Sequence, residues 1–309
     1  MSLDKKHLSQ ILKSEAHSLG FSGIAIAKSE HMDEEAKRLE QWLNMGYHGE
    51  MSYMDNHFDV RTDPGKLVDG AKSVICLLYN YYTEVKQSDE DAPQISMYAL
   101  GKDYHKVVRK KLKDLVKVLQ GKIGDFNARV FVDSAPILER DWAKRSGLGW
   151  VGKNTLLIHP QKGSFFFLAE IVCDVEFEYD LPMKDYCGTC TRCIEACPTN
   201  AIGKEGYVMN GAKCISYLTI EKKGDIPSEF QPLMENYMYG CDICQKVCPW
   251  NRFSTPHTEE AFIPADNLLQ MSKRDWQEIT EEVFNKLFEG SAVKRTKFEG
   301  LRRNIGFLG

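Results

Sequence analysis

The chain has 309 residues, of which 43% are hydrophobic and 27% are charged, and its formal net charge is −4. This composition suits a water-soluble protein with one or two packed domains. It provides no overall positive field for nucleic acid, so any polyanion would have to meet a local basic patch. No apolar run approaches the roughly 18 residues of a membrane span, and the N-terminus has neither an apolar signal core nor twin arginines. We therefore expect a cytoplasmic protein that has no membrane partner and acts as a monomer.

Residues 1–175 alternate between helical and strand patterns. Apolar residues at helical spacing predict helices over 4–19, 33–45, 103–122 and 137–145. Apolar runs predict strands over 23–27, 73–81 and 128–133, with a hairpin formed by 154–158 and 164–172. The polar residues 83–96 are expected to form a surface loop. The alternation predicts an α/β or α+β domain.

The longest predicted helix has a cationic outer face that includes Lys106, Arg109 and Lys110. A solvated helix face and a surface that meets a polyanion both account for these cations. The helix begins Asp103-Tyr-His105, which is the start of the corrinoid motif D-x-H-x-x-G, but valine stands where that motif requires glycine. We therefore interpret Asp103 as the helix N-cap rather than His105 as a metal ligand.

Eight of the ten cysteines lie between Cys187 and Cys248. They form a C-x2-C-x2-C-x3-C-P run, a lone cysteine and a C-x2-C-x3-C-P run. The first spacing is that of ferredoxins, and eight thiolates are what two four-iron clusters need. Zinc sites and disulfides are the alternatives, but the triple run before Cys-Pro suits a tetrahedral site poorly, and nothing indicates an oxidising compartment. The remaining Cys76 and Cys173 lie in apolar runs and are expected to be buried.

The ferredoxin rule, by which the fourth cysteine of a run ligates the other cluster, assigns the ligands. One cluster is expected on Cys187, Cys190, Cys193 and Cys248. The other is expected on Cys197, Cys214, Cys241 and Cys244. The gaps of two residues let three sulfurs surround one cluster, whereas the cysteine before proline begins a helix that leads away. We therefore expect a ferredoxin-like domain over residues 176–255.

Iron–sulfur clusters move single electrons, and the large preceding domain is expected to hold what receives them. No G-x-G-x-x-G follows a strand, and neither G-x-x-x-x-G-K-[ST] nor the haem motif C-x-x-C-H is present. Gly147-Leu-Gly149 lacks the third glycine of a nucleotide-binding loop and follows a predicted helix. A corrinoid, a substrate radical centre and a partner protein remain as possible acceptors.

Five further motifs occur together with the cysteine runs. They are Arg61-x-Asp-Pro64, Gly101-Lys-Asp-Tyr-His105, Val132-Asp-Ser134, Glu139-Arg-Asp-Trp-Ala143 and Gly147-x-Gly-Trp-x-Gly-Lys-Asn154. Over about residues 1–255 this combination resembles the epoxyqueuosine reductases. Members of that family reduce the epoxide of epoxyqueuosine, at the wobble position of tRNA, to the cyclopentene of queuosine. They use cobalamin and two 4Fe–4S clusters, and they resemble reductive dehalogenases.

The resemblance implies an α+β fold in three parts. Residues 1–175 would form an α/β-like cobalamin domain similar to reductive dehalogenases, 176–255 the ferredoxin-like domain, and 256–309 a short helical segment. Many members carry C-terminal helical repeats, and the last segment is expected to be the start of such a region. The expected partners are tRNA carrying epoxyqueuosine in a GUN anticodon and a low-potential electron donor such as flavodoxin or ferredoxin.

Asp133 is the candidate proton donor, because it follows a predicted strand and matches the proton donor proposed for the family. The departing alkoxide needs a proton, and an apolar, desolvated site is expected to favour the acid form of Asp133. The alternative is that Asp133 only caps the turn at Ser134-Ala-Pro136.

Other residues are expected to bind the cofactor or the tRNA. Arg61 matches a family position near the corrinoid, with a surface ion pair as the alternative. The family binds cobalamin without a histidine ligand, and Asp133 is expected to contact the cofactor as well. Hydrogen bonds to corrin amides are expected from Asn154 and Ser164, and cofactor contacts beside the second cluster from Ser216 and Asp242. Basic side chains expected to meet tRNA phosphates are Lys106, Arg109, Lys110 and Lys222.

Two other functions stay open at this point. One is a corrinoid reductive dehalogenase, although respiratory members of that class usually carry a Tat signal. The other is a ferredoxin-like electron-transfer protein, which would need no corrinoid and would therefore lack cobalt.

Overall fold

A computed structural model of the chain describes residues 4–265 and 267–309. Its centre is a four-stranded sheet in the order β1-β2-β7-β4, in which each neighbouring pair is antiparallel. The strands are β1 (Gly23–Lys28), β2 (Ser73–Asn80), β4 (Ala128–Phe131) and β7 (Phe166–Cys173). The antiparallel pairing makes the domain α+β, as the resemblance implied, because the parallel sheet of a doubly wound α/β fold is absent from the described residues.

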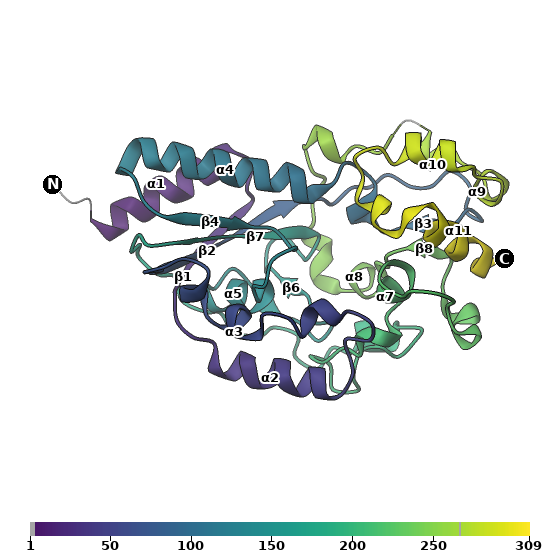
Figure 1. Ribbon diagram of the computed structural model, residues 1–309, viewed down its shortest axis with the longest axis horizontal. Coiled ribbons are helices and arrows are strands. Elements are labelled where there is room, and N and C mark those ends of the chain that lie inside the picture. The colour runs from purple at the N-terminus through teal and green to yellow at the C-terminus, as the bar shows by residue number, and fades with distance from the viewer. Residues whose placement is uncertain (1–3, 266) are drawn as a thin grey trace.

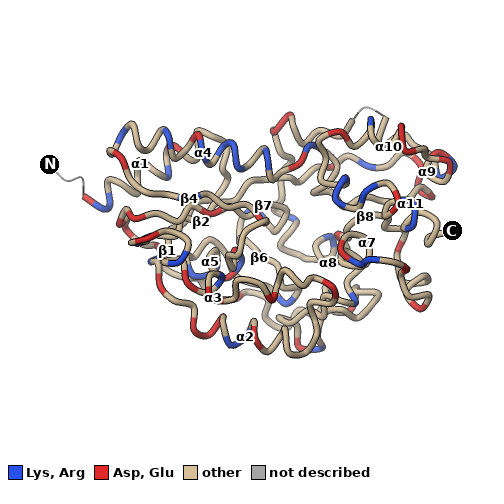
Figure 2. Tube along the Cα trace, viewed as in Figure 1, with Lys and Arg blue, Asp and Glu red and all other residues tan. Residues whose placement is uncertain are grey.

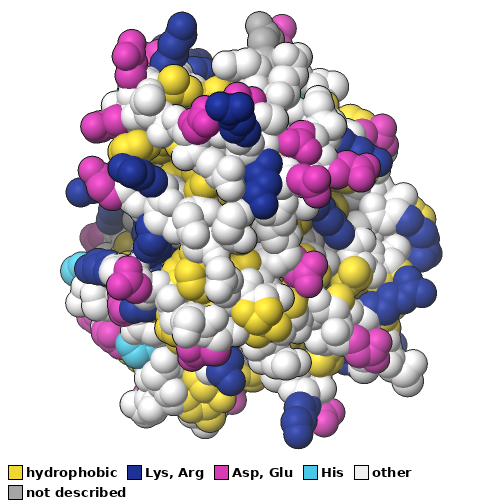
Figure 3. Space-filling view, turned by 90° about the vertical axis from the view of Figure 1, so that its right-hand side faces the viewer, with side chains coloured by type: hydrophobic (Ala, Val, Ile, Leu, Met, Phe, Trp, Pro, Cys, Tyr) yellow, Lys and Arg dark blue, Asp and Glu magenta, His cyan; other side chains and the backbone are white. Residues whose placement is uncertain are grey.

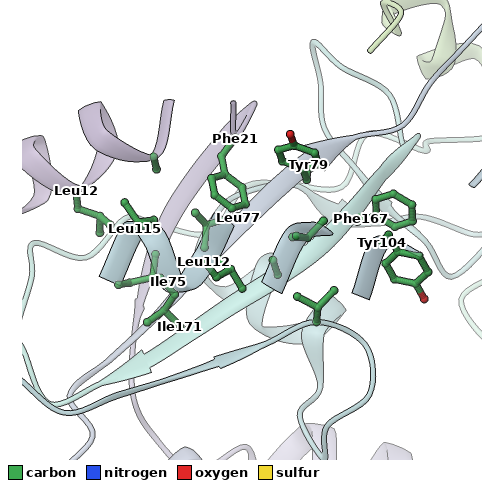
Figure 4. Close-up of a cluster of buried hydrophobic side chains, with 14 of the residues drawn as sticks. Leu12, Phe21, Ile75, Leu77, Tyr79, Tyr104, Leu112, Leu115, Phe167 and Ile171 are labelled. Atoms are coloured by element: carbon green, nitrogen blue, oxygen red, sulfur yellow. The ribbon is translucent and has the colours of Figure 1, made fainter. Parts of the chain in front are cut away.

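Helices cover both faces of this sheet (Figure 1). Successive strand residues point to opposite faces, so Ile75, Leu77 and Tyr79 of β2 enter one core while Val74, Cys76 and Leu78 enter another. The first core contains the helices α1 (Lys5–Ser18) and α4 (Tyr104–Ile123), and Figure 4 shows Leu12 and Leu115 meeting over Ile75. The second contains α5 (Glu139–Arg145), and α2 (Asp33–Asn44) and α3 (Phe58–Thr62) lie on that side in Figure 1.

The start and the buried face of α4 are those that its sequence predicts. The side chain of Asp103 accepts a hydrogen bond from the backbone amide of His105 at 3.0 Å, which confirms the predicted N-cap. The apolar residues Val108, Leu112 and Leu115 are fully buried at helical spacing. Lysines and arginines occupy the outer face, as Figure 2 shows along this helix.

The cluster domain and the C-terminal segment are built from short elements. Around the cysteines these are α6 (Arg192–Glu195), α7 (Ile215–Ile220), β8 (Tyr237–Tyr239) and α8 (Ile243–Lys246), with β8 pairing in parallel with β3 (Gln94–Ile95). The C-terminal segment contains α9 (Lys273–Gln277), α10 (Glu281–Leu287) and α11 (Lys297–Leu308); α11 packs on β8 and α7, and α9 and α10 pack against α11. Basic and acidic side chains are interspersed over this end of the molecule (Figure 3).

The expected hairpin of 154–158 with 164–172 was wrong: β6 (Leu157–Ile158) pairs with β5 (Trp150–Val151), and β7 pairs with β2 and β4. The expected surface loop holds over residues 83–93, and β3 begins at Gln94.

Glycines 147 and 149 serve close packing and not a nucleotide loop. Gly147 has φ +79°, and a Cβ there would lie 2.0 Å from the carbonyl oxygen of Leu181. A Cβ on Gly149 would lie 2.5 Å from the carbonyl oxygen of Ile158. Only glycine allows the backbone to pass at these distances.

Among residues 4–265 and 267–309, no helix has the length and apolar character needed to cross a membrane.

Replacing Leu112 by Ala tests the core between α4 and the sheet. We expect the free energy of unfolding to fall by about 2–5 kcal/mol, because a fully buried leucine leaves a cavity. The exposed neighbour Lys113 provides the control, and its replacement by Ala should change the same quantity by less than about 0.5 kcal/mol. Anaerobic urea unfolding measures both, and equal small effects would contradict this assignment of the core.

Candidate active site

The eight cysteines lie in two groups in space. Burial raises the pKa of Cys193 to about 11, with contributions from Cys248, Cys187 and Cys190. Burial likewise raises the pKa of Cys241 to about 12, with contributions from Cys214 and Cys197, and the same group surrounds Cys244. This grouping agrees with the two ligand sets proposed from the spacing, and Cys193 of the first set also lies near Cys244 of the second. Such clustering of thiols fits cluster binding, because bound iron removes their protons.

A buried polar network joins the cluster domain to the start of β7. The backbone amide of Ser164 donates to Asn251 Oδ1 at 2.6 Å, and Gln245 Nε2 donates to the carbonyl oxygen of Ser164 at 3.0 Å. Gly163 precedes this contact with φ +71°, and a Cβ there would lie 2.1 Å from Asn251 Oδ1. Asn154 adds a longer bond, from its amide to the carbonyl oxygen of Cys244 at 3.4 Å. Asn154 and Ser164 therefore link the two domains directly.

A cavity of about 1090 Å³ lies beside this network. Tyr82, Met97 and Phe165 line it from the sheet domain, and Asp242 and Cys248 line it from the cluster domain. Its volume is at the upper end of the range of about 300–1,000 Å³ for small-molecule sites, so it suits a large cofactor next to a cluster ligand.

Asp242 is fixed where the cavity meets the second cluster. It is 2% exposed, and its carboxylate accepts from the hydroxyl of Ser96 and from the backbone amide of Met97 at 2.8 Å. Burial raises the pKa of Asp242 despite these bonds. Ser216, at the start of α7, is half-buried, and its backbone amide faces the thiol of Cys214. Both residues thus adjoin the second ligand group.

Asp133 follows β4, and its side chain is 56% exposed at φ +55°. Its carboxylate accepts hydrogen bonds from the hydroxyl of Tyr104 and from Nε2 of His105 at 3.2 Å. The Tyr104 ring stacks between His105 and Phe167 with centroid distances of 4.1 Å, which fixes its direction. The Asp133 side chain therefore lies at the surface in a direction that Tyr104 and His105 fix, which a turn cap alone would not require.

The expectation that the acid form of Asp133 is favoured was wrong. Burial raises its pKa, but the hydrogen bonds from His105 and Tyr104 outweigh burial and lower the pKa overall. Burial also opposes the charged form of His105, yet its bonds to Asp103 and Asp133 raise its pKa to about 9. These shifts favour the protonated form of His105 and the charged form of Asp133.

Sequence reasoning assigned no role to Tyr104 or His105. A signal was available, because both belong to the motif Gly101-Lys-Asp-Tyr-His105 that carried the family resemblance. What the sequence does not show is that the start of α4 lies against the end of β4, which brings the motif to Asp133.

Arg61 lies buried in α3, with 8% of its surface exposed. Its guanidinium donates to the carbonyl oxygens of Tyr53 at 2.7 Å and of Asn56 at 3.2 Å. Burial lowers its pKa, and within the described chain no carboxylate lies at ion-pair distance from it. The alternative of a surface ion pair was therefore wrong.

The predicted tRNA-binding cations lie in different environments. Arg109 donates to the hydroxyl of Ser134 at 3.1 Å, so it lies over the loop that carries Asp133. Lys106 is exposed on α4, and Lys110 pairs with Asp114 at 2.9 Å. Lys222 pairs with Glu50. The structure thus places Arg109 nearest to the aspartate.

Family models match two parts of the chain. Residues 61–134 match the model described as epoxyqueuosine reductase QueG, DUF1730, and residues 186–251 match a 4Fe–4S double cluster binding domain. The epoxyqueuosine reductase of Cyclobacterium marinum is 55% identical over 100% of this chain and 98% of its own, and that of Escherichia coli K12 is 43% identical over 98% and 81%. The chain belongs to the epoxyqueuosine reductase family.

Solved structures agree with this membership. An epoxyqueuosine reductase with an epoxyqueuosine-modified tRNA-Tyr stem loop matches with a TM-score of 0.86 and 30% identity, over 98% of this chain and 80% of that one. The Bacillus subtilis enzyme, described with its catalytic aspartate loop swung out of the active site, matches with a TM-score of 0.85 and 30% identity, over 98% and 81%. A reductive dehalogenase described as B12-dependent shares the fold alone, with a TM-score of 0.53 and 16% identity, over 99% and 38%.

The raised pKa of His105 predicts a dependence of stability on pH. Its contribution is complete below its unfolded pKa of about 6.5 and is lost as pH rises through about 9. The free energy of unfolding of the native protein should therefore fall relative to that of the His105→Gln variant between pH 6 and 10. The exposed His7 provides the control through His7→Gln. Parallel curves for the native and His105→Gln proteins would contradict the contact with Asp133.

Proposed function

We propose that this protein reduces epoxyqueuosine at the wobble position of tRNA to queuosine, with electrons passing through two 4Fe–4S clusters to a cobalamin. The observation that carries the proposal is the full-length match to epoxyqueuosine reductases, together with a matching structure that holds an epoxyqueuosine-modified stem loop. The match to a double cluster domain supports the electron route.

The reaction has a definite balance. Removing the epoxide oxygen breaks two C–O bonds and leaves a carbon–carbon double bond, and the oxygen departs as water. This consumes two electrons and two protons. Each cluster moves one electron at a time, so a pair of clusters suits a two-electron reduction.

The cavity beside Cys248 and Asp242 is the proposed cobalamin site. Its volume of about 1090 Å³ and its contact with a cluster ligand fit a large redox cofactor, and the fold likeness to a dehalogenase described as B12-dependent supports the choice. Bound there, cobalamin would supply a strongly reducing metal centre to the epoxide. Asp242 and Ser216 would hold it on the side of the second cluster, while Asn154 and Ser164 would fix the wall between the domains.

Asp133 and Arg61 are the further proposed cofactor contacts on the sheet domain, and neither of them lines the cavity described above. Asp133 is the proposed proton donor to the departing oxygen, and it would pass on a proton that it receives from His105. The contact of Asp133 with His105 supports this route, because the ring nitrogen lies at hydrogen-bond distance from the carboxylate. Burial and Asp133 raise the pKa of Tyr104, so its hydroxyl orients the carboxylate through a hydrogen bond and keeps its own proton. Arg61 would keep its buried guanidinium on the loop that contains Tyr53.

The cations near the loop are the proposed contacts to tRNA with a GUN anticodon. Arg109 and Lys106 would meet phosphates beside the flipped wobble base, with Lys110 and Lys222 further out. The position of Arg109 over Ser134 supports this order. We further propose that the protein works in the cytosol as a monomer and takes electrons from a flavodoxin or ferredoxin.

The Asp133→Asn variant tests the proton donor. With tRNA that carries epoxyqueuosine, turnover should fall by at least about a hundredfold, because the amide cannot supply the proton. Iron and corrinoid content should stay at the native level. Asp114→Asn, which alters an exposed aspartate on α4, is the matched control. Near-native turnover by Asp133→Asn would remove this residue from the mechanism.

Salt dependence tests the tRNA surface. Binding of a modified anticodon stem loop should weaken steadily with added salt, because cations that neutralise phosphates release counterions. Arg109→Ala should flatten that dependence more than Lys113→Ala, a change on the same helix. A flat response of the native protein from low to moderate salt would contradict a polyanion-binding surface.

A further inference from the structure

Two carboxyl groups that the proposed chemistry does not use lie behind Asp133. Glu139 is the first residue of α5, and Glu170 lies in the middle of β7 between Phe131 of β4 and Cys76 of β2. Glu170 is 0% exposed, and its carboxyl group faces that of Glu139, so that each shifts the pKa of the other. Apart from Glu139, no described group bonds to its carboxylate oxygens. A pair of acids in a core is costly, so its presence calls for a function.

Glu139 connects this acid to the loop of Asp133. Its Oε1 accepts a hydrogen bond from the backbone amide of Asp133 at 2.5 Å. Within the loop, the amide of Ser134 donates to the carbonyl oxygen of Val132 at 2.6 Å and that of Ile137 donates to Ala135 at 2.8 Å. From outside the loop, Tyr104 and His105 bond to the Asp133 carboxylate, and Arg109 bonds to the Ser134 hydroxyl. Asp133 also has φ +55°, a conformation that a non-glycine residue keeps only when its surroundings hold it.

The pKa shifts of Glu139 and Glu170 are consistent with the contact between Glu139 and the Asp133 loop. Burial and the neighbouring Asp133 raise the pKa of Glu139 to about 8, and burial and Glu139 raise the pKa of Glu170 well above its ordinary value. These shifts favour the uncharged form of both acids, which lessens the repulsion between Glu139 and the Asp133 carboxylate. Within the described chain, the other charged or titratable groups that face the pair are Arg140, Tyr104 and the thiol of Cys76.

We propose that Glu139 is a positioning residue that holds the catalytic loop through the backbone amide of Asp133, and that Glu170 supports Glu139 from the sheet. The expected effect of Glu139 on turnover rests on the proposed function, whereas its expected effect on the loop does not. Glu139 keeps the Asp133 carboxylate within reach of His105 and Tyr104, and it touches neither the substrate nor the cofactor.

The test compares Glu139→Ala with Glu139→Gln by hydrogen exchange and by turnover. Glu139→Ala removes the acceptor, so the amides of residues 133–137 should exchange about tenfold faster. Its kcat should fall by a similar factor with little change in KM. Glu139→Gln keeps an acceptor oxygen and should preserve both values. Glu281→Ala, at the first turn of α10, controls for the loss of a helix N-terminal charge.

A pH series gives a second, independent measurement. Above about pH 8, Glu139 ionises beside the Asp133 carboxylate, and the loop should loosen. Loop exchange in the native protein should then rise faster with pH than it does in Glu139→Gln, whose side chain cannot ionise. This arm uses native protein and a conservative variant, so it holds even if Glu139→Ala fails to fold.

The outcomes separate cleanly. Native loop exchange and native turnover in Glu139→Ala would overturn the proposal, as would a Glu139→Gln variant that loosens as much as Glu139→Ala, or identical pH responses of the native protein and Glu139→Gln. If the native protein does not turn over modified tRNA, the proposed function fails while loop exchange still tests the contact of Glu139.

Discussion

The buried network of Ser164, Gln245 and Asn251 is the constraint on which the site depends. It holds the loop before β7 against the segment between two cluster ligands, Cys244 and Cys248. Amide and hydroxyl groups at full burial are stable only when they bond to one another, so the two domains have little freedom to slide. The cavity lies beside this junction, within reach of a cluster on one side and of the sheet domain on the other.

In the proposed mechanism, protons and electrons reach the site from different sides. The clusters lie beyond the cavity, whereas Asp133, Tyr104 and His105 come from the ends of β4 and α4. Hydrogen bonds from His105 and Tyr104 lower the pKa of Asp133, and the contacts of His105 with Asp103 and Asp133 raise the pKa of the imidazole to about 9. A carboxylate that can be reprotonated from a neighbour suits a reaction that consumes two protons.

The sequence predicted the parts of the structure that local patterns determine. The ferredoxin spacing led to the same two cysteine groups that the structure brings together, and the helix of α4 and its Asp103 cap followed from periodicity. The hairpin was wrong because strand partners depend on tertiary packing: β7 finds β2 and β4 far away in the chain. The pKa of Asp133 was wrong for a related reason, since His105 lies 28 residues earlier. Glu170 carried a signal, a lone acid in an apolar strand, that was not used.

The most direct test of the central claim is an anaerobic titration with a one-electron reductant. Protein loaded with both clusters and cobalamin would receive counted electrons in the presence of tRNA that carries epoxyqueuosine. The account predicts one queuosine for every two electrons, and none when cobalamin is withheld from protein with intact clusters. Equal product without cobalamin would contradict it, and so would clusters that take up the electrons while the corrinoid-loaded protein leaves the epoxide unchanged.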